Sequence, residues 1–577
     1  MQGGEELFSK KWKTSERKYN VLEERHVSIP MRDGVTLDAD IFRPDSPEKF
    51  PVILGIHPYD NAWQSDPIKP FGMCIAAGGV EAGDQNFYVR RGYIKVNVNC
   101  RGTGRSEGFF NMHLPPADTD TYDVIEWLAE QPWCDGNVGM FGVSWLAMRA
   151  QMVAHLKPPH LKAIFAPFAA VDQYRDAVYH GGILNHDFTE GWIKIVDNPR
   201  FPPGSFTEQV LGEEVFKEKL AEALSDPDLM AVPHIVHTLN TGEGPIDNFL
   251  LYLDGPFWRA QTTDYEGTDI PAYLGACWGM QGLHLPGATT SWNNWKGPKK
   301  MTIGPPLYLD RPVYQYAYES LRWFDYWLKG INTGIMDEDP VRLFVVGTGE
   351  WKTSTEWPLP ETKFTPFYLH ENGLLSEREH WPNEGFSTFE DSHFNRGSLT
   401  FVTPPLVETT EVVGPMVLNL YGSSTDTDVL WFVTILDYDP DGKETLLTRG
   451  WLRGSHRRTD PERSTPWLPY HTHTEREPLT PNEVYEFNVE IRPYGIEFKP
   501  GHRIGVRVKC VDDEEPTSSL EGHNVGHLWR QKSSRVTVYH NADYPSHLIL
   551  PITKGNVIGT FMSGGKMPKE HFPFRKF

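Results

Sequence analysis

Cysteine is scarce in this sequence, and its spacing excludes several classes of protein. The 577 residues contain five scattered cysteines, with no CxxC pair: Cys74, Cys100, Cys134, Cys277 and Cys510. Zinc knuckles and disulfide-stapled secreted domains both need denser, regularly spaced cysteines. We therefore expect reduced thiols in a cytoplasmic protein. No other grouping of His, Asp and Glu has metal-ligand spacing, so we also expect no metal.

Long apolar runs and clusters of basic residues are missing as well. No stretch approaches the roughly 18 apolar residues that a membrane-spanning helix requires. The N-terminal segment MQGGEELFSKKWKTSERKYN lacks the apolar core of a secretory signal. The formal net charge is −22 at pH 7, whereas nucleic acids and anionic membranes are bound through clustered Lys and Arg. We therefore expect a small-molecule substrate, no nucleic acid and no membrane partner.

The residues that are present predict a globular protein with more than one domain. Hydrophobic residues make up 39% of the chain and aromatic residues 13%, which is ample for hydrophobic cores. Single cores stop growing beyond roughly 250 to 300 residues. A chain of this length therefore predicts two or three domains.

The first part of the chain alternates short apolar runs with helical patterns. The apolar runs lie at 51–56, 93–99, 138–141, 163–165, 270–278 and 300–303. This alternation predicts a parallel sheet covered by helices on both faces. The stretch 171–264 interrupts it with aromatic and helical segments and is interpreted as an inserted helical cap, while an amphipathic helix at 314–329 closes the region.

Beyond about residue 360 the pattern changes to short alternating strands separated by turn residues. That pattern is typical of an all-β sandwich. The predicted division is an α/β core at 1–170 and 265–350, a cap at 171–264 and a C-terminal β domain at 360–577.

A tight turn between a strand and a helix carries the strongest chemical signal. An apolar strand runs into Gly142-Val143-Ser144-Trp145-Leu146, and a helical stretch follows. The nucleophile elbow of an α/β-hydrolase has this order and needs small residues near the serine, because its turn is crowded. Gly142 satisfies this need, whereas Leu146 stands where the short motif has glycine. The context favours a nucleophilic Ser144 over a serine that only caps the helix.

The chain resembles the cocaine esterase and X-prolyl dipeptidyl aminopeptidase family of serine hydrolases. The matching motifs run through nearly the whole sequence, at 31–37 (MRDGVTL), 57–60 (HPYD), 101–104 (RGTG), 106–108 (SEG), 142–146 (GVSWL), 439–442 (DPDG), 498–503 (FKPGHR) and 544–548 (YPSHL). The resemblance implies an α/β-hydrolase core, an inserted helical cap and a C-terminal jelly roll.

The resemblance also implies roles for individual residues. Ser144 matches the nucleophile, and the backbone N–H of Trp145 matches one donor of the oxyanion hole. Tyr59 matches the second donor, through its phenol hydroxyl. One such preorganised donor is worth roughly 2.7 to 4 kcal/mol of barrier, so a pair implies strong stabilisation of an oxyanion.

The acid and the base that complete the family's site are absent from their expected places. Met280 stands where the family has an aspartate, and the loop 303–308 (IGPPLY) contains no histidine. A serine hydroxyl needs a base to become nucleophilic. His284, four residues past Met280, is the substitute that we assign to the site. Other side chains that could serve or support a base are His57, His180, His186 and Asp310, although any of these histidines could be structural.

Two classes of function follow from these residues. The first is a serine hydrolase that acts on an ester, amide or other acyl substrate through Ser144 and an unusual base. The second is a non-hydrolytic enzyme, such as a lyase, an isomerase or a C–C cleaving enzyme, in which Tyr59 and Trp145 stabilise an enolate; a binding protein is a further alternative. We expect no cofactor, and a homo-oligomer is compatible with the sequence. The pocket is predicted between core and cap, lined by 171–188 and Trp192.

Overall fold

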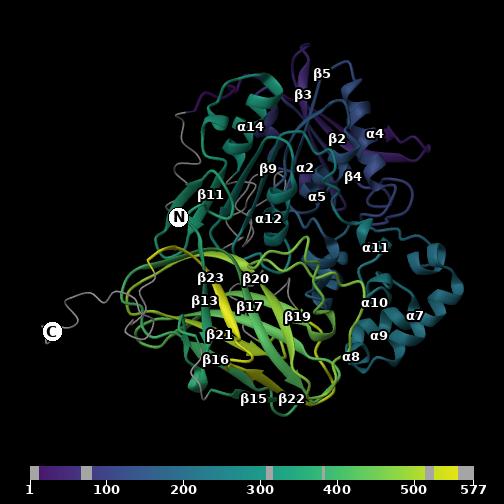
Figure 1. The fold of residues 1–577 in the computed structure, drawn as a ribbon. Coiled ribbons are helices and arrows are strands. Elements are labelled where there is room, and N and C mark those ends of the chain that lie inside the picture. The colour runs from purple at the N-terminus through teal and green to yellow at the C-terminus, as the bar shows by residue number, and fades with distance from the viewer. Residues whose placement is uncertain (1–11, 67–80, 307–315, 380–383, 514–525, 556–577) are drawn as a thin grey trace, which may run out of the picture.

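The computed structural model describes residues 12–66, 81–306, 316–379, 384–513 and 526–555. A ten-stranded sheet organises the first part of the chain and an eleven-stranded sheet the last part (Figure 1). One hydrophobic cluster contains residues of both, so the two parts pack against each other. Within the described ranges no helix combines the length and the apolar content needed to cross a bilayer.

The first sheet is mostly parallel. Its strands are β1 (Val21–Pro30), β2 (Thr36–Pro44), β3 (Phe50–His57), β4 (Ile94–Asn99), β5 (Cys134–Phe141), β6 (Leu161–Phe165), β9 (Ala272–Cys277), β10 (Lys299–Gly304), β11 (Val341–Val345) and β12 (Glu350–Ser354). Their order is β1-β2-β4-β3-β5-β6-β9-β10-β11-β12. The pairs from β4 to β11 are parallel. The predicted parallel sheet is confirmed, and β5, which leads to Ser144, lies near its middle.

Helices flank this sheet, as the alternating pattern predicts. They are α2 (Asn61–Ser65), α3 (Gln85–Val89), α4 (Ala117–Ala129), α5 (Trp145–Met152), α12 (Leu285–Asn294) and α14 (Ala317–Lys329). Gly330 ends α14 in the left-handed conformation, with φ of 67°, which glycine adopts without strain. The predicted start of this helix, at 314, lies outside the described residues.

The cap is inserted between β6 and β9. It contains β7 (Tyr179–His180), β8 (Ile183–Leu184), α6 (His186–Ile193), α7 (Glu213–Ser225), α8 (Pro227–Met230), α9 (Pro233–Thr241), α10 (Asp247–Leu250) and α11 (Pro256–Arg259). The charged segment 207–224 is not one continuous helix. Gly212, with φ of 100°, separates a short π-helical turn from α7, because that backbone conformation cannot continue a helix.

The C-terminal part is all β and antiparallel. Its strands are β13 (Lys363–Leu369), β14 (Leu375–Ser376), β15 (Phe386–Asp391), β16 (Ser398–Val402), β17 (Thr410–Ser424), β18 (Leu430–Tyr438), β19 (Glu444–Arg453), β20 (Tyr485–Phe498), β21 (Arg503–Lys509), β22 (Ser534–Tyr539) and β23 (His547–Lys554). The long β17 pairs with β20, β22 and β23, which links the strands into one curved, nearly barrel-like sheet. The predicted C-terminal jelly roll is confirmed as a fold. The residue limits of the three parts stay a proposal.

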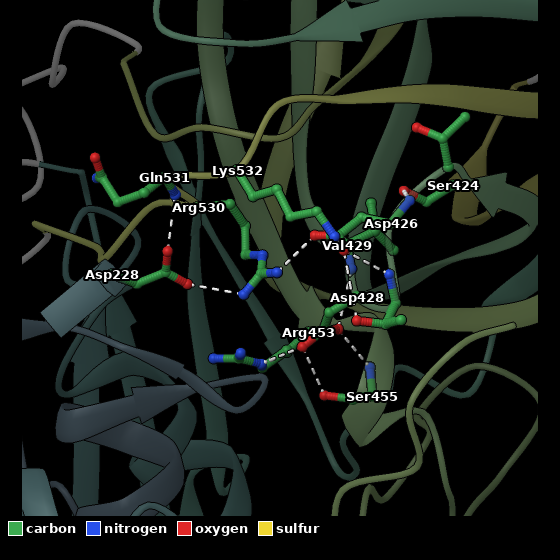
Figure 2. A network of polar contacts seen from close by, with 12 residues as sticks. Asp228, Ser424, Asp426, Asp428, Val429, Arg453, Ser455, Arg530, Gln531 and Lys532 are labelled. Carbon is green, nitrogen blue, oxygen red and sulfur yellow. Dashed lines mark hydrogen bonds and ion pairs between the residues drawn. The ribbon is translucent and has the colours of Figure 1, made fainter. Parts of the chain in front are cut away.

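A network of charged side chains joins the cap to the β domain (Figure 2). Asp228 on α8 accepts hydrogen bonds from the Arg530 guanidinium, at 2.9 Å, and from the Gln531 N–H, at 2.7 Å. Arg530 also donates to Asp426 at 2.6 Å. Figure 1 places α8 beside the β domain, so this network fixes the position of the cap helices against it.

Candidate active site

The turn that follows β5 holds Ser144 in a strained conformation. Ser144 has φ of 57° and ψ of −122°, a region that side-chain-bearing residues rarely occupy. The helix α5 begins at the next residue. A Cβ added to Gly142 would lie 2.2 Å from the Leu146 Cβ, so only glycine fits two residues before the serine. Strain and crowding of this kind characterise a nucleophile elbow.

The neighbouring strand explains how Leu146 replaces the glycine of the short motif. Leu146 is buried, and its Cδ2 lies against Gly55 of β3. A Cβ at Gly55 would approach that atom to 2.9 Å. The space that the motif usually obtains from a glycine after the serine is therefore provided here by a glycine on the adjacent strand.

The structure brings His284 and Ser144 together. The Nε2 atom of His284 lies 3.2 Å from the Ser144 Oγ, within hydrogen-bond distance. His284 immediately precedes α12, and its backbone N–H donates to the Met280 carbonyl at 3.2 Å. The ring also meets the Phe168 ring edge-on, with centroids 5.9 Å apart. Backbone and ring contacts thus hold the imidazole against the elbow.

Burial determines the protonation state of this histidine. His284 is only 2% exposed, and burial lowers its pKa to about 3, because the dry surroundings disfavour the imidazolium. The ring is therefore neutral at pH 7 and its nitrogen can accept a proton. It is a weak base, since an efficient general base has a pKa near the working pH.

Tyr59 lies beyond β3 and contacts the cap. The indole N–H of Trp192, on α6, donates to the Tyr59 hydroxyl oxygen at 3.2 Å. The Trp192 ring also stacks on Trp145, with centroids 5.2 Å apart and planes 16° apart. Indole N–H groups that leave solvent usually find a hydrogen-bond acceptor. This need is the one sequence signal that could have linked Trp192 to a polar group of the core.

The two expected oxyanion donors come from adjacent strands. Tyr59 follows β3 and Trp145 follows β5, and these strands pair in parallel. The N–H of Trp145 is in the first turn of α5, where backbone N–H groups have no acceptor within the helix. This N–H is therefore available to donate a hydrogen bond to an oxyanion.

The other candidate histidines have different surroundings. His57 is buried and its ring stacks near Tyr59, with centroids 6.3 Å apart. His180 contacts His527 of the β domain, with 2.8 Å between Nδ1 and Nε2. The Nδ1 of His186 lies 2.8 Å from Asp187 Oδ1. None of these contacts involves the Ser144 hydroxyl, and Asp310 lies outside the described residues.

One cavity overlaps the predicted pocket in part. A cavity of about 470 Å³ is lined by residues of the cap, of α12 and of the β domain, including Val171, Arg175, Thr289 and Arg492. Part of the predicted lining segment borders this cavity, whereas Ser144 and Trp192 do not, so the position of the substrate pocket stays a prediction. The stack of Trp145 and Trp192 joins the elbow to α6 of the cap. Across the described ranges, no group of three potential ligands could hold a metal ion.

These features define the class of protein. A parallel sheet with a strained serine after its central strand, an inserted cap and a buried imidazole at the serine hydroxyl together make an α/β-hydrolase. Residues 33–306 match the X-Pro dipeptidyl-peptidase (S15 family) model. Residues 333–549 match the X-Pro dipeptidyl-peptidase C-terminal non-catalytic domain. The chain belongs to this family of esterases and dipeptidyl-peptidases and is a hydrolase.

Relatives with known names agree with this assignment. The cocaine esterase of Rhodococcus sp. is 27% identical over 92% of this chain and 98% of its own length. A putative Xaa-Pro dipeptidyl-peptidase of Bacillus cereus is 24% identical over 83% of each chain. The crystal structure of a CocE/NonD family hydrolase from Staphylococcus aureus covers 95% of this chain and 100% of its own, with a TM-score of 0.77 and 25% identity.

Proposed function

We propose that this protein hydrolyses a small ester through Ser144, with His284 as the base and with Tyr59 and the Trp145 N–H as oxyanion donors. The observation that carries the proposal is the 3.2 Å separation of the Ser144 Oγ and the His284 Nε2 at a strained elbow. The base belongs to the segment that holds Met280 in place of the family's aspartate. His284 would thus replace the histidine that the family has after the next strand.

The chemistry follows from these positions. The Ser144 hydroxyl gives its proton to His284 Nε2 while its oxygen attacks the carbonyl carbon of the substrate. Tyr59 and the Trp145 N–H donate to the oxyanion that develops. The imidazolium returns the proton to the leaving oxygen, and a water molecule then hydrolyses the acyl-enzyme with the same base.

The weak base favours one class of acyl substrate. Because burial lowers the pKa of His284 to about 3, removal of the serine proton is costly, and an electrophilic carbonyl with a good leaving group reduces that cost. Activated esters meet this condition better than amides. The named activity of the cocaine esterase relative is that of an esterase, which supports the same class. A cytoplasmic location and a homo-oligomer remain predictions.

Covalent labelling and ester turnover test the proposal. We expect a fluorophosphonate probe to label wild type and not Ser144→Ala. We expect kcat/KM for p-nitrophenyl esters to fall at least about 100-fold in both Ser144→Ala and His284→Ala, the order of loss found for a general base. His502→Ala is the matched control, because His502 contacts Asp437 in the β domain, and it should retain the wild-type rate.

The alternative functions have their own signatures in the same experiment. Turnover that survives Ser144→Ala and falls with Tyr59→Phe contradicts the proposal and favours a non-hydrolytic enzyme. Absence of both labelling and turnover favours a binding protein.

A further inference from the structure

A partly buried acid beside Tyr59, Glu81, is not used in the chemistry described above. The backbone N–H of Glu81 donates to the Gln64 Oε1 of α2 at 3.0 Å. Its carbonyl accepts the N–H of Val143, the residue before Ser144, at 3.2 Å. Glu81 is therefore fixed between the helix that follows Tyr59 and the nucleophile elbow.

Glu81 is partly exposed as a residue, but its carboxyl oxygen Oε2 is shielded from solvent, and only part of its hydrogen-bonding capacity is used. Its carboxyl group makes a side-chain hydrogen bond with Tyr59. Its Oε2 is buried and has no hydrogen-bond partner among the residues that the structure describes. A buried carboxylate oxygen without a partner is costly, which favours the neutral acid. Burial raises the pKa of Glu81 to about 8, in spite of the Tyr59 hydrogen bond, so the acid form prevails at pH 7.

The protonation state of Glu81 determines which acceptor the Tyr59 hydroxyl donates its single hydrogen bond to. A phenol donates one hydrogen bond, and its oxygen accepts up to two. Trp192 already donates to that oxygen. An ionised Glu81 only accepts, so it takes the phenol hydrogen. A protonated Glu81 instead donates to the phenol oxygen, and the phenol hydrogen is then not consumed by Glu81.

We propose that Glu81 is a positioning residue that, as a neutral acid, directs the Tyr59 O–H toward the substrate oxyanion, and that its ionisation withdraws this donor. The inference rests on the proposed function, since Tyr59 is one of the two oxyanion donors there. Donation into the phenol oxygen by Glu81 and Trp192 also strengthens the phenol as a donor, because hydrogen bonds in a chain polarise one another.

Other ionisable groups lie around this site. Burial lowers the pKa of both His57 and His284 to about 3, so both stay neutral between pH 6 and pH 10. Lys95 on β4, whose buried amine has a pKa lowered to about 7, donates to Asn97 and acts electrostatically on His57. Two carboxylates flank the Tyr59 loop, those of Asp60 and Asp197. The backbone N–H of Asp197 donates to the Pro58 carbonyl.

The pH dependence of ester hydrolysis tests the role of Glu81. We expect wild-type kcat/KM to fall above about pH 8 toward a plateau roughly 100-fold lower, the cost of losing one oxyanion donor. In Glu81→Gln the amide still donates to Tyr59 and cannot ionise, so kcat/KM should stay within about threefold of wild type at pH 7 and should not fall through pH 8. Tyr59→Phe should be low at all pH values and should lack the alkaline fall.

A measurement independent of turnover separates this inference from the proposed function. The difference spectrum between wild type and Glu81→Gln should show the infrared carbonyl band of a protonated carboxylic acid at pH 7 and lose it above pH 8; the subtraction removes the contribution of Asp176, whose pKa is also raised by burial. The inference is overturned if this band is absent, if the alkaline fall persists in Glu81→Gln, or if Glu81→Gln loses as much activity at pH 7 as Tyr59→Phe. Lys95→Met, which removes the neighbouring amine, should keep the alkaline fall. A wild type that shows the band but hydrolyses no ester overturns the proposed function, and with it the role assigned to Glu81.

Discussion

The surroundings of Ser144 and the contact between cap and β domain are both buried, yet they treat charge in opposite ways. At Ser144 the polar groups are uncharged at pH 7, namely the hydroxyls of Ser144 and Tyr59 and the imidazole of His284. At the cap contact the polar groups are ionic, with Asp228 and Asp426 shared by Arg530 (Figure 2). The groups around Ser144 are neutral until the reaction creates charge. The groups at the cap contact are permanently charged and paired.

The difference has a physical reason in each case. Buried ions need partners in good geometry to offset their lost hydration, which gives the cap a defined position on the β domain. A catalytic site gains most from groups that respond to charge developing in the transition state. The anion of a permanent ion pair at Ser144 would accept the hydrogen bonds of Tyr59 and Trp145 before the substrate arrived.

The largest expected effect comes from removing one member of a permanent ion pair. Asp428 accepts from Arg453 Nε at 2.7 Å, and both side chains are less than a tenth exposed. Asp428→Ala leaves the Arg453 guanidinium buried without its carboxylate, which should lower the free energy of unfolding by about 3 to 5 kcal/mol. Chemical denaturation monitored by fluorescence measures this loss.

The control for this variant lies in the same network. Lys532 contacts Asp426, but its side chain is 63% exposed. Lys532→Ala should change the free energy of unfolding by no more than about 1 kcal/mol, because water screens exposed ion pairs. Equal losses in the two variants would show that burial does not govern the strength of the network.

A smaller effect on the free energy of unfolding is expected when the pH is lowered, because His284 is buried in its neutral form. The folded-state pKa of His284 is about 3, below its unfolded value of about 6.5. Its neutral form therefore stabilises the fold fully above pH 6.5, and this stability is lost as the pH falls toward 3. Between pH 7 and pH 5 the loss from this one group is about 2 kcal/mol.

The variant His284→Gln isolates that contribution. The free energy of unfolding should fall between pH 7 and pH 5 by about 2 kcal/mol less in His284→Gln than in wild type. Urea denaturation at the two pH values gives the difference directly. If wild type and variant lose stability in parallel, then His284 is not the buried neutral group described here.

The smallest effect concerns the link between the cap and the oxyanion hole. Trp192→Phe removes the N–H that reaches Tyr59 while keeping an aromatic ring against Trp145. One hydrogen bond contributes about 1 kcal/mol, so kcat/KM for activated esters should fall about fivefold with little change in thermal stability. An unchanged kcat/KM would mean that the cap contributes nothing to the Tyr59 hydroxyl.

The fold could be predicted because its signals are local. The alternation of apolar runs with helices, the strand before Gly142 and the turn-rich pattern beyond residue 360 each lie within a few tens of residues. The elbow could be predicted for the same reason. The break at Gly212 could not be predicted, because a glycine inside a charged helical pattern does not by itself indicate whether the helix continues.

The details of the site depend on contacts between distant segments, which a single sequence does not reveal. His284 was one of several histidines in loops, and only the turn from Met280 to Leu285 brings its ring to Ser144. Glu81 was not noticed, since a single glutamate in a loop has no distinguishing pattern. The packing of Trp192 onto Trp145 likewise joins segments far apart in the chain.

The insertion of the cap has a consequence for how this protein is made. Strand β6 pairs directly with β9, with Ile164 opposite Ala272, so the entire cap is synthesised between two neighbouring strands of one sheet. Contacts between such distant segments form slowly, and chains that emerge from the ribosome fold from their N-terminal end. The half-sheet that ends at β6 must therefore wait, with one edge uncovered, while the cap is translated. Slower translation across 171–264 would prolong that exposure and make the nascent chain more dependent on chaperones.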